Sequence, residues 1–423
     1  MALSEVMRDG AVVRDVKAIS LVSAGHFCSH FFQLALPPLF PLLIGEFNTT
    51  YTALGLLMTA SALTGSAAET PLGFLVDRFG ARWILVGGLV LHSLAIMAMG
   101  FADTYWALLT FFMVAGLANS VYHPADYSLL SATVDPKRLG RALSLHTFVG
   151  NIGWVLVPIV MVALTAIWGW REALMTIGVF GLFVALCIAT LGGFLREEKQ
   201  VRAEAKAAAP PGATTATTPG GIALLLSPPI LMGFLFFMMI SAGTGGLRTF
   251  SVSALVAIYD APLEAAGKAL TGFLIGSSVG ILAGGLIADR FRQPQSLAMI
   301  GFMGAAVCAA LVGLVTVPII AVVALLTIAG FCSGAVQPAR DLLVRAITPK
   351  GSMGKVFGFL SSGLGLGGAL VGPFYGWIMD NSDPRWVFLV SAIIIMASVV
   401  TVGGLGRAAR KKASEEAALA SSS

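Results

Sequence analysis

Charged residues are scarce in this 423-residue sequence. Asp, Glu, Lys and Arg together make up 11% of the chain, whereas 57% of it is hydrophobic. A soluble domain carries about 25% charged residues, and a chain this apolar cannot bury its side chains in one aqueous core. Lipid must therefore be the solvent for most of the chain, which predicts an integral protein of the lipid bilayer.

Cysteines are also few, and none of them has the spacing of a metal site. All four stand singly in apolar segments, at Cys28, Cys187, Cys308 and Cys332. We interpret them as free packing thiols. Because no other metal-ligand spacing, catalytic triad or paired carboxylates stand out, the sequence predicts neither a metal site nor a catalytic centre.

Nucleotide-binding loops are missing too. The Gly-Lys pairs at 267–268 and 354–355 are followed by Ala269 and Val356, where a phosphate loop requires Ser or Thr. Glycines at 363–368 match a dinucleotide fingerprint in spacing, but they lie in an apolar helical segment, where small residues favour close helix packing. We therefore expect no nucleotide, no cofactor and no enzymatic activity, and any transport must draw on an ion gradient.

Apolar segments of helix length are what the sequence has in abundance. Twelve of them approach or exceed the roughly 20 residues that a helix needs to cross a bilayer. They lie at 18–44, 51–76, 82–102, 104–133, 138–166, 171–194, 223–257, 264–288, 295–316, 318–347, 353–379 and 385–406. A polar stretch rich in Ala, Pro and Thr separates two sets of six, and this composition is typical of a linker.

Landmarks in the first half of the chain recur about half a chain length later. Asp77-Arg78 recurs as Asp289-Arg290, and nearly the same offset relates Pro124 to Pro338, Pro136-Lys137 to Pro349-Lys350, and Gly150, Gly153 and Pro158 to Gly365, Gly368 and Pro373. Such a repeat in an apolar chain indicates a duplicated membrane bundle, the usual plan of a secondary transporter.

Together these patterns predict the fold class and its divisions. We expect an all-α membrane protein with twelve transmembrane helices in two pseudo-symmetric six-helix bundles. The predicted parts are a cytoplasmic N-terminal segment (1–17), an N-terminal bundle (18–194), a cytoplasmic linker (195–222), a C-terminal bundle (223–407) and a cytoplasmic tail (408–423).

The net charge of +5 is explained by the orientation of the chain in the membrane. Placing both termini in the cytoplasm puts most Lys and Arg on that side and leaves outside only Arg171, Lys268 and Arg385. Cytoplasmic loops of membrane proteins carry such an excess of basic residues. The basic charge therefore indicates topology and not a nucleic-acid partner.

The loop between the second and third spans carries a recognisable motif. Gly73-x-x-x-Asp77-Arg78-x-Gly80-x-Arg82 resembles the signature of the major facilitator superfamily, and Asp289-Arg290 resembles its weaker copy in the second half. Three further stretches resemble the fosmidomycin-resistance type of exporter in that superfamily: Gly25-His26 with 36–43, Ser120–Pro124, and Gly150–Gly153. The resemblance implies two six-helix halves that rock about a central site in a bacterial inner membrane.

The resemblance also implies a cytoplasmic gate at the motif and its copy. In this superfamily such a cluster latches the outward-facing state, and here its members would be Asp77, Arg78, Arg82, Asp289 and Arg290. The alternative is that the arginines only fix topology. The two Asp residues favour the latch, because topology alone needs no acid.

Polar residues inside the spans predict a solute and proton pathway, since burying a charge in lipid costs roughly 2.5–3.5 kcal/mol. The resemblance implies that helices one, four, seven and ten surround the cavity. The pathway residues we predict there are His26, Tyr122, His123, Asp126, Arg248, Gln337 and Arg340. The arginines would hold an anionic group, and His123 with Asp126 would exchange the coupling proton.

Other ionisable residues in the spans leave more than one interpretation. His30, His92 and His146 are expected to be packing residues, and Asp341 is expected to form a helix-end ion pair with Arg345.

Three functions remain open. The first is proton-coupled export of a small anionic or amphipathic solute, which the fosmidomycin-like stretches favour. The second is proton-symport import of an organic acid. It is favoured by the two arginines and by Val157, which stands where drug–proton antiporters carry Gly before the proline of helix five. The third is a non-transporting membrane receptor.

Overall fold

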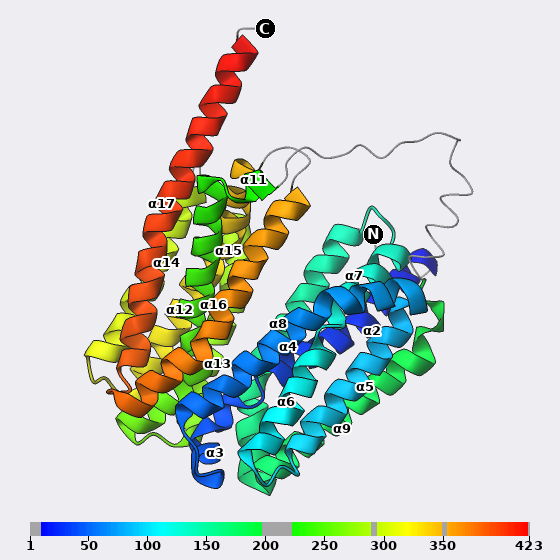
Figure 1. Cartoon of the computed structure of the whole chain (residues 1–423), viewed down its shortest axis with the longest axis vertical. Coiled ribbons are helices and arrows are strands. Elements are labelled where there is room, and N and C mark those ends of the chain that lie inside the picture. The colour runs from blue at the N-terminus through cyan, green and yellow to red at the C-terminus, as the bar shows by residue number, and fades with distance from the viewer. Residues whose placement is uncertain (1–9, 197–221, 289–293, 349–352, 422–423) are drawn as a thin grey trace. The chain divides into compact units, whose positions relative to one another are not determined.

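The computed structural model describes residues 10–196, 222–288, 294–348 and 353–421, and every regular element in these ranges is a helix (Figure 1). The first half contains α2 (Gly10–Gln33), η1 (Pro37–Leu39), α3 (Phe40–Glu46), α4 (Tyr51–Phe79), α5 (Ala81–Met99), α6 (Tyr105–Asn119), α7 (Tyr122–Thr133), α8 (Leu139–Trp168), α9 (Trp170–Leu191) and η2 (Gly192–Phe194). The second half contains α11 (Ile222–Leu225), α12 (Pro228–Tyr259), α13 (Leu263–Ala288), α14 (Pro294–Leu314), α15 (Ile319–Ile347), α16 (Met353–Asn381) and α17 (Trp386–Ser421).

The predicted all-helical membrane class is confirmed. Within the described ranges, 11 helical segments are long and apolar enough to cross a membrane. The twelfth predicted span is α4, whose 29 residues are also long enough, although it carries Glu69, Asp77 and Arg78. Large side chains on these helices are exposed, among them Phe74 (69%), Trp106 (71%) and Leu286 (76%), as expected for surfaces that lipid covers.

Two predicted spans are not continuous helices. The span predicted at 104–133 breaks between α6 and α7, directly at Ser120 and Val121. Pro124 explains the break, because its ring clashes with the carbonyl of the residue four positions earlier and it has no N–H to donate. The span predicted at 18–44 likewise breaks after Gln33, before Pro37 opens η1.

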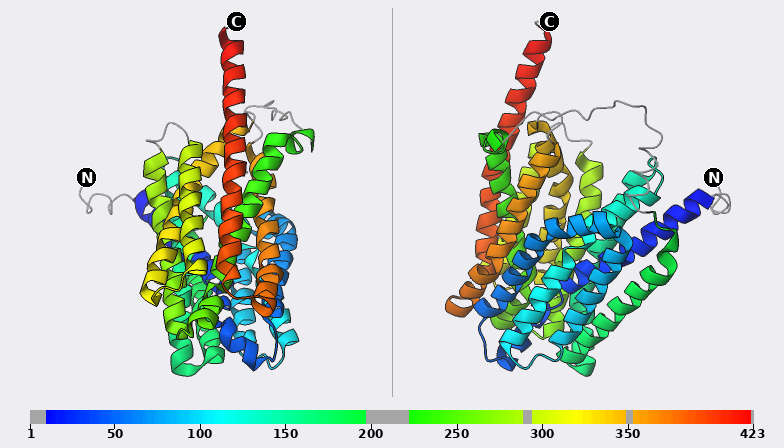
Figure 2. Two further views of the ribbon diagram at one scale, coloured as in Figure 1. Left: turned by 90° about the vertical axis from the view of Figure 1, so that its left-hand side faces the viewer. Right: turned by 45° about the vertical axis from the view of Figure 1, so that its right-hand side comes forward.

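The residues predicted to form a cytoplasmic tail after Arg407 are helical as far as Ser421. The helix α17 continues without interruption from Trp386 to Ser421. Its end extends beyond the other helices of the same half (Figure 2). Alanines and charged residues after Arg407 are good helix formers, so the transmembrane helix is prolonged and not terminated at this position.

The contacts divide the chain into two units that share several pairings of equivalent helices. One unit holds Met1–Thr49 and Ala60–Thr215, and the other holds Thr50–Thr59 and Ala216–Ser423. In the first unit α2 packs on α8, α5 on α9, and α5 on α6; in the second α12 packs on α16, α14 on α17, and α14 on α15. These are equivalent pairs in the repeat, so the sequence duplication is matched by a duplicated packing pattern.

The start of α4 belongs by its contacts to the second unit. The carboxylate of Asp380, in α16, accepts hydrogen bonds from the backbone N–H groups of Tyr51 and Thr52, both at 2.8 Å, and from the Thr52 hydroxyl. A carboxylate at a helix N-terminus satisfies free N–H groups and interacts favourably with the helix dipole. Asp380 therefore caps α4 from another helix.

An arginine clamp occurs at equivalent positions of both units. The Arg171 guanidinium donates to the carbonyl oxygens of Gly100 and Ala102, at 3.2 and 2.7 Å, and pairs with Glu46 at 2.8 Å. Its repeat partner Arg385 donates to the Gly313 carbonyl at 3.4 Å and to another group of the same loop. Each clamp satisfies carbonyls at the end of a helix that would otherwise lack partners.

Glycines on α13 form a stripe against α15. A Cβ atom added at Gly276, Gly280 or Gly284 would collide with the backbone of α15. Gly330 and Gly334 of α15 meet α13 in the same way. Helices in lipid associate through such close backbone approach, because no hydrophobic force drives them together.

Two neighbouring glycines on α13 test this packing. Gly284→Ala would place a methyl group against the Ala335 carbonyl, whereas nothing lies within 4 Å of the Cβ position at Gly285. We expect Gly284→Ala to destabilise the protein by about 1–3 kcal/mol. Gly285→Ala should leave stability unchanged or raise it, since Ala is the better helix former by up to about 1 kcal/mol. Thermal unfolding in detergent measures both, and equal midpoints would contradict the packing described.

Candidate functional site

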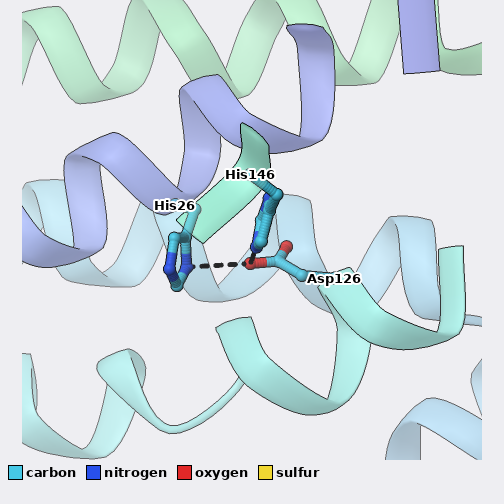
Figure 3. Close-up of side chains that lie close together, drawn as sticks. All are labelled: His26, Asp126 and His146. Carbon is cyan, nitrogen blue, oxygen red and sulfur yellow. Dashed lines mark ion pairs between the residues drawn. The ribbon is translucent and has the colours of Figure 1, made fainter. Parts of the chain in front are cut away.

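A carboxylate lies fully buried between two histidines in the first unit (Figure 3). Asp126, in α7, has an exposed fraction of 0%. One of its oxygens, Oδ2, lies 3.2 Å from Nδ1 of His26, in α2, and 3.4 Å from Nε2 of His146, in α8. Three helices thus contribute one side chain each to a single polar cluster, which we call the Asp126 cluster: His26, Asp126 and His146.

The facing atoms of the Asp126 cluster have no hydrogen-bond partner within the described part of the chain. This holds for His26 Nδ1, for His146 Nε2 and for both carboxylate oxygens of Asp126. The atoms are close, but the ring nitrogens are not aligned for hydrogen bonds to the carboxylate. Buried polar groups are nearly always satisfied, so this cluster is an unusual feature of the first unit.

Small residues on α8 make room for the cluster. A Cβ atom added at Gly150 would collide with the imidazole ring of His26, and one at Gly153 would lie 2.6 Å from the carbonyl of Phe27. Because α2 can approach α8 this closely, the His26 and His146 rings stack with centroids 4.2 Å apart. Ser23, one turn before His26, lies with its hydroxyl 3.2 Å from Nδ1 of His146.

Two more histidines surround the Asp126 cluster. The ring of His30 lies 4.4 Å from that of His26 and stacks on Trp154 at 4.0 Å. The ring of His123 lies 5.3 Å from that of His26, and this residue is exposed. Four of the five histidines of the chain therefore gather around one acid.

Tyr122 lies on the other side of this region of α7, in the core of the first unit. It is fully buried, and its hydroxyl lies 3.2 Å from Nδ1 of His92, in α5. His92 is itself buried, as expected for a packing residue. The pair fixes the start of α7, from which His123 and Asp126 project.

A hollow in the first unit adjoins the same helices. Its volume is 430 Å³, and its lining residues are Ile19, Ser20, Ser23, Ala24, Phe27, Leu145, Val149 and Phe180. The lining is apolar except for the two serines. Ser23 therefore connects an apolar surface of α2 with the His146 ring behind it.

The predicted pathway residues of the second unit are engaged within that unit. Arg340, in α15, pairs with Asp341 at 2.9 Å and lies over the Phe237 ring, 4.7 Å from its centroid. Asp341 was expected to pair with Arg345, and the structure places it on Arg340 instead. Arg248, in α12, donates to the Thr244 hydroxyl at 3.2 Å. Gln337 lies one turn before Arg340 and is half-buried.

Comparison with known proteins identifies the family. A family model described as Major Facilitator Superfamily matches residues 22–263 and 245–421. The chain belongs to the Major Facilitator Superfamily. This is a family of membrane transporters, so the chain is a transporter and not an enzyme, as the sequence predicted.

Two curated relatives match parts of this transporter. It is 25% identical over 177 residues to the fosmidomycin resistance protein of Escherichia coli K12. The matched region covers 40% of this chain and 43% of the relative. It is 26% identical over 141 residues to a probable L-galactonate transporter of the same organism. This region covers 33% of this chain and 31% of the relative. The predicted resemblance to fosmidomycin-resistance exporters is confirmed, although the chain matches less than half the length of either relative.

A solved structure shares the fold of this transporter. The structure of a bacterial homologue of the human lysosomal transporter Spinster, in an inward-facing and unoccupied conformation, superposes with a TM-score of 0.78. The match covers 94% of this chain and 98% of the other, at 17% identity. At this identity the likeness shows the fold alone.

The predicted gate residues of the transporter are described only in part. Arg82 donates to the carbonyl oxygen of Ala189 near the end of α9 and lies over Trp83. Arg78 lies over Phe79. Asp289 and Arg290 lie outside the described residues, and so does the side chain of Asp77.

Sequence reasoning missed His146 and Ser23. His146 was expected to pack, yet it contacts Asp126 as closely as His26 does. A signal was present, because His146, Gly150 and Gly153 recur on one face of α8 at helical spacing. A polar ring followed by two small residues on that face indicates close contact with a neighbouring helix.

The buried tyrosine gives a test of how α7 is held. Tyr122→Phe removes the hydroxyl near His92 and leaves a buried nitrogen unsatisfied, which should cost about 1–3 kcal/mol. Tyr127→Phe, five residues further along α7, changes a side chain that is 45% exposed and should cost nothing measurable. Thermal unfolding of both variants checks this, and equal losses would contradict a specific role of the Tyr122–His92 contact.

Proposed function

We propose that this protein is a proton-coupled secondary transporter that exports a small anionic or amphipathic solute by alternating access. The observation that carries the proposal is the fully buried carboxylate of Asp126 within a membrane bundle. Ionisable residues in such positions are costly and mark ion or proton pathways. His26 and His123 near this acid offer further groups able to carry a proton.

The proposed pathway contains the acid Asp126 and the two basic residues Arg248 and Arg340. It consists of His26, Tyr122, His123, Asp126, Arg248, Gln337 and Arg340, as predicted from the sequence. The flat guanidinium of Arg340 is already ordered by stacking on Phe237 and by Asp341. An anionic group of the solute would replace Asp341 on Arg340, which is suited to paired hydrogen bonds with carboxylates and phosphonates.

The proposed gate and orientation follow the sequence analysis. We propose that Asp77, Arg78, Arg82, Asp289 and Arg290 form the cytoplasmic gate. The Arg82 contact with the end of α9 supports this, because it anchors the motif loop to its own bundle. The bias of Lys and Arg supports cytoplasmic termini, and the bacterial relatives support an inner-membrane location.

Proton-symport import of an organic acid is the second candidate. It is favoured by the match to a probable L-galactonate transporter, because such a substrate is a carboxylate that the two arginines would suit. Membrane vesicles distinguish the candidates. With an imposed pH gradient, fosmidomycin or L-galactonate should accumulate in inside-out vesicles if the protein exports it and in right-side-out vesicles if it imports it.

Neutralising the buried acid tests the coupling. Asp126→Asn keeps the size of the side chain but removes its charge. We expect gradient-driven accumulation to fall at least about tenfold, whereas exchange of labelled for unlabelled solute across the membrane persists, because exchange needs no net proton movement. The measurement is solute flux in reconstituted vesicles with and without a pH gradient.

A matched control is Asp103→Asn, since this carboxylate is 91% exposed and lies outside the proposed pathway. It should retain both gradient-driven flux and exchange. Undiminished gradient-driven flux in Asp126→Asn would remove the acid from the coupling mechanism.

Charge-conserving replacement of Arg340 tests the anion site. Arg340→Lys keeps the positive charge but loses the planar fork and the stacking on Phe237. We expect the solute KM to rise roughly tenfold, which corresponds to about 1.4 kcal/mol of binding, with little change in maximal flux. An unchanged KM would show that Arg340 acts only as a packed structural charge.

A further inference from the structure

The three facing side chains of the Asp126 cluster converge as metal ligands do. The donor atoms of His26, Asp126 and His146 all lie within 4.8 Å of one another, and all three residues are buried. We infer that these residues bind a divalent transition-metal ion, with Zn²⁺ as the expected occupant. The inference does not rest on the proposed function, because purified protein can bind an ion without solute or gradient. The ion and the coupling proton would compete for the same atoms of His26 and Asp126, so that bound Zn²⁺ would exclude proton uptake there.

The spacing of the donor atoms fits a common metal ion. Ligand atoms on a tetrahedron with bonds of about 2.1 Å lie about 3.4 Å apart. The carboxylate oxygen of Asp126 is 3.2 Å from the His26 nitrogen and 3.4 Å from the His146 nitrogen. Both separations therefore have the length of ligand–ligand edges around one ion.

The lack of hydrogen bonds between these close atoms supports the same inference. Nδ1 of His26 and Nε2 of His146 have no hydrogen-bond partner within the described residues, although the carboxylate is near. Nitrogens that share a metal ion with an oxygen point at the ion and not along the line to the oxygen. Four polar atoms that are buried and unsatisfied at one place need an occupant, and one ion would satisfy all three side chains.

The donor set selects the class of ion. Two imidazole nitrogens and one carboxylate oxygen suit Zn²⁺ and its neighbours among the first-row transition metals. Mg²⁺ and Ca²⁺ prefer shells made of oxygen, which two histidines do not provide. Three protein ligands leave a fourth position for water or for another group.

A second layer of contacts holds the ligands in place. The Ser23 hydroxyl lies 3.2 Å from Nδ1 of His146, the ring nitrogen that would not face the ion. Metal-binding histidines commonly use this second nitrogen in a hydrogen bond that fixes the ring. Gly150 allows the His26 ring to lie flat against α8, because any side chain there would collide with it.

The amino-acid sequence alone predicts no metal site, because the three ligands are far apart along the chain. The three ligands come from α2, α7 and α8, and no two of them stand in a ligand motif. Only the packing of these helices brings them together.

The test is a titration of the purified full-length transporter, free of any histidine tag, with Co²⁺ alone. Visible absorption reports four-coordinate Co²⁺, and we expect one equivalent to bind in the unchanged protein. Asp126→Asn and His146→Gln should lose the absorption band. Ser23→Ala should weaken binding roughly 10- to 100-fold, as expected for the partner of a ligand.

Asp103→Asn is the matched control, because it also neutralises a carboxylate of the first unit, one that is 91% exposed and not part of the cluster. It should bind Co²⁺ as the unchanged protein does. Size-exclusion chromatography and circular dichroism establish that each variant is folded. If the unchanged protein gives no band, or if Asp126→Asn and His146→Gln retain it, the metal site is disproved.

X-ray absorption of the Zn²⁺-loaded unchanged protein decides the matter even if the ligand variants do not fold. The expected first shell contains only nitrogen and oxygen at about 2.0–2.1 Å. A sulfur ligand or a six-coordinate oxygen shell would overturn the assignment.

Discussion

A carboxylate enclosed by helices in a membrane needs polar partners that the protein itself brings to it. An isolated buried charge is among the most costly features a protein can contain. Asp126 lies against the imidazole rings of His26 and His146, which arrive from two other helices. The close approach of α2, α7 and α8 is therefore tied to the chemistry of one side chain.

Close approach in turn depends on small residues at defined positions. In the first unit, Gly150 and Gly153 let α2 and its histidines lie against α8. In the second unit the glycine stripe on α13 lets α15 approach until backbone lies against backbone. In lipid, packing of this kind replaces the hydrophobic effect as the force between helices. The same residue type thus builds a polar cluster in one half and an apolar seam in the other.

Sequence patterns predicted the fold well because they depend on local properties. Apolar length gives the spans, and the half-length repeat gives the duplication that the helix pairing then displays. The break before Tyr122 was harder to place, although Pro124 accounts for it once its carbonyl clash is considered. The site was predicted only in part. His26 and Asp126 stand out as polar residues in apolar spans, but their contact with His146 depends on which faces of three helices meet, and no local pattern specifies that.

Duplication also shows which features can diverge and which are kept. Arg171 and Arg385 occupy equivalent positions and both bind carbonyls of a preceding loop, at Gly100 and Gly313. Asp126 and Arg340 are equivalent as well, yet they carry opposite charges. A clamp that satisfies backbone groups is required by the fold in each half, whatever the half does. A charged residue that the fold does not require can be replaced by one of the opposite sign. The contacts of the two residues then differ. Asp126 lies against histidines from other helices, whereas Arg340 pairs with its neighbour Asp341 and lies over the Phe237 ring. The residues that break the repeat are therefore the ones in which function is to be sought.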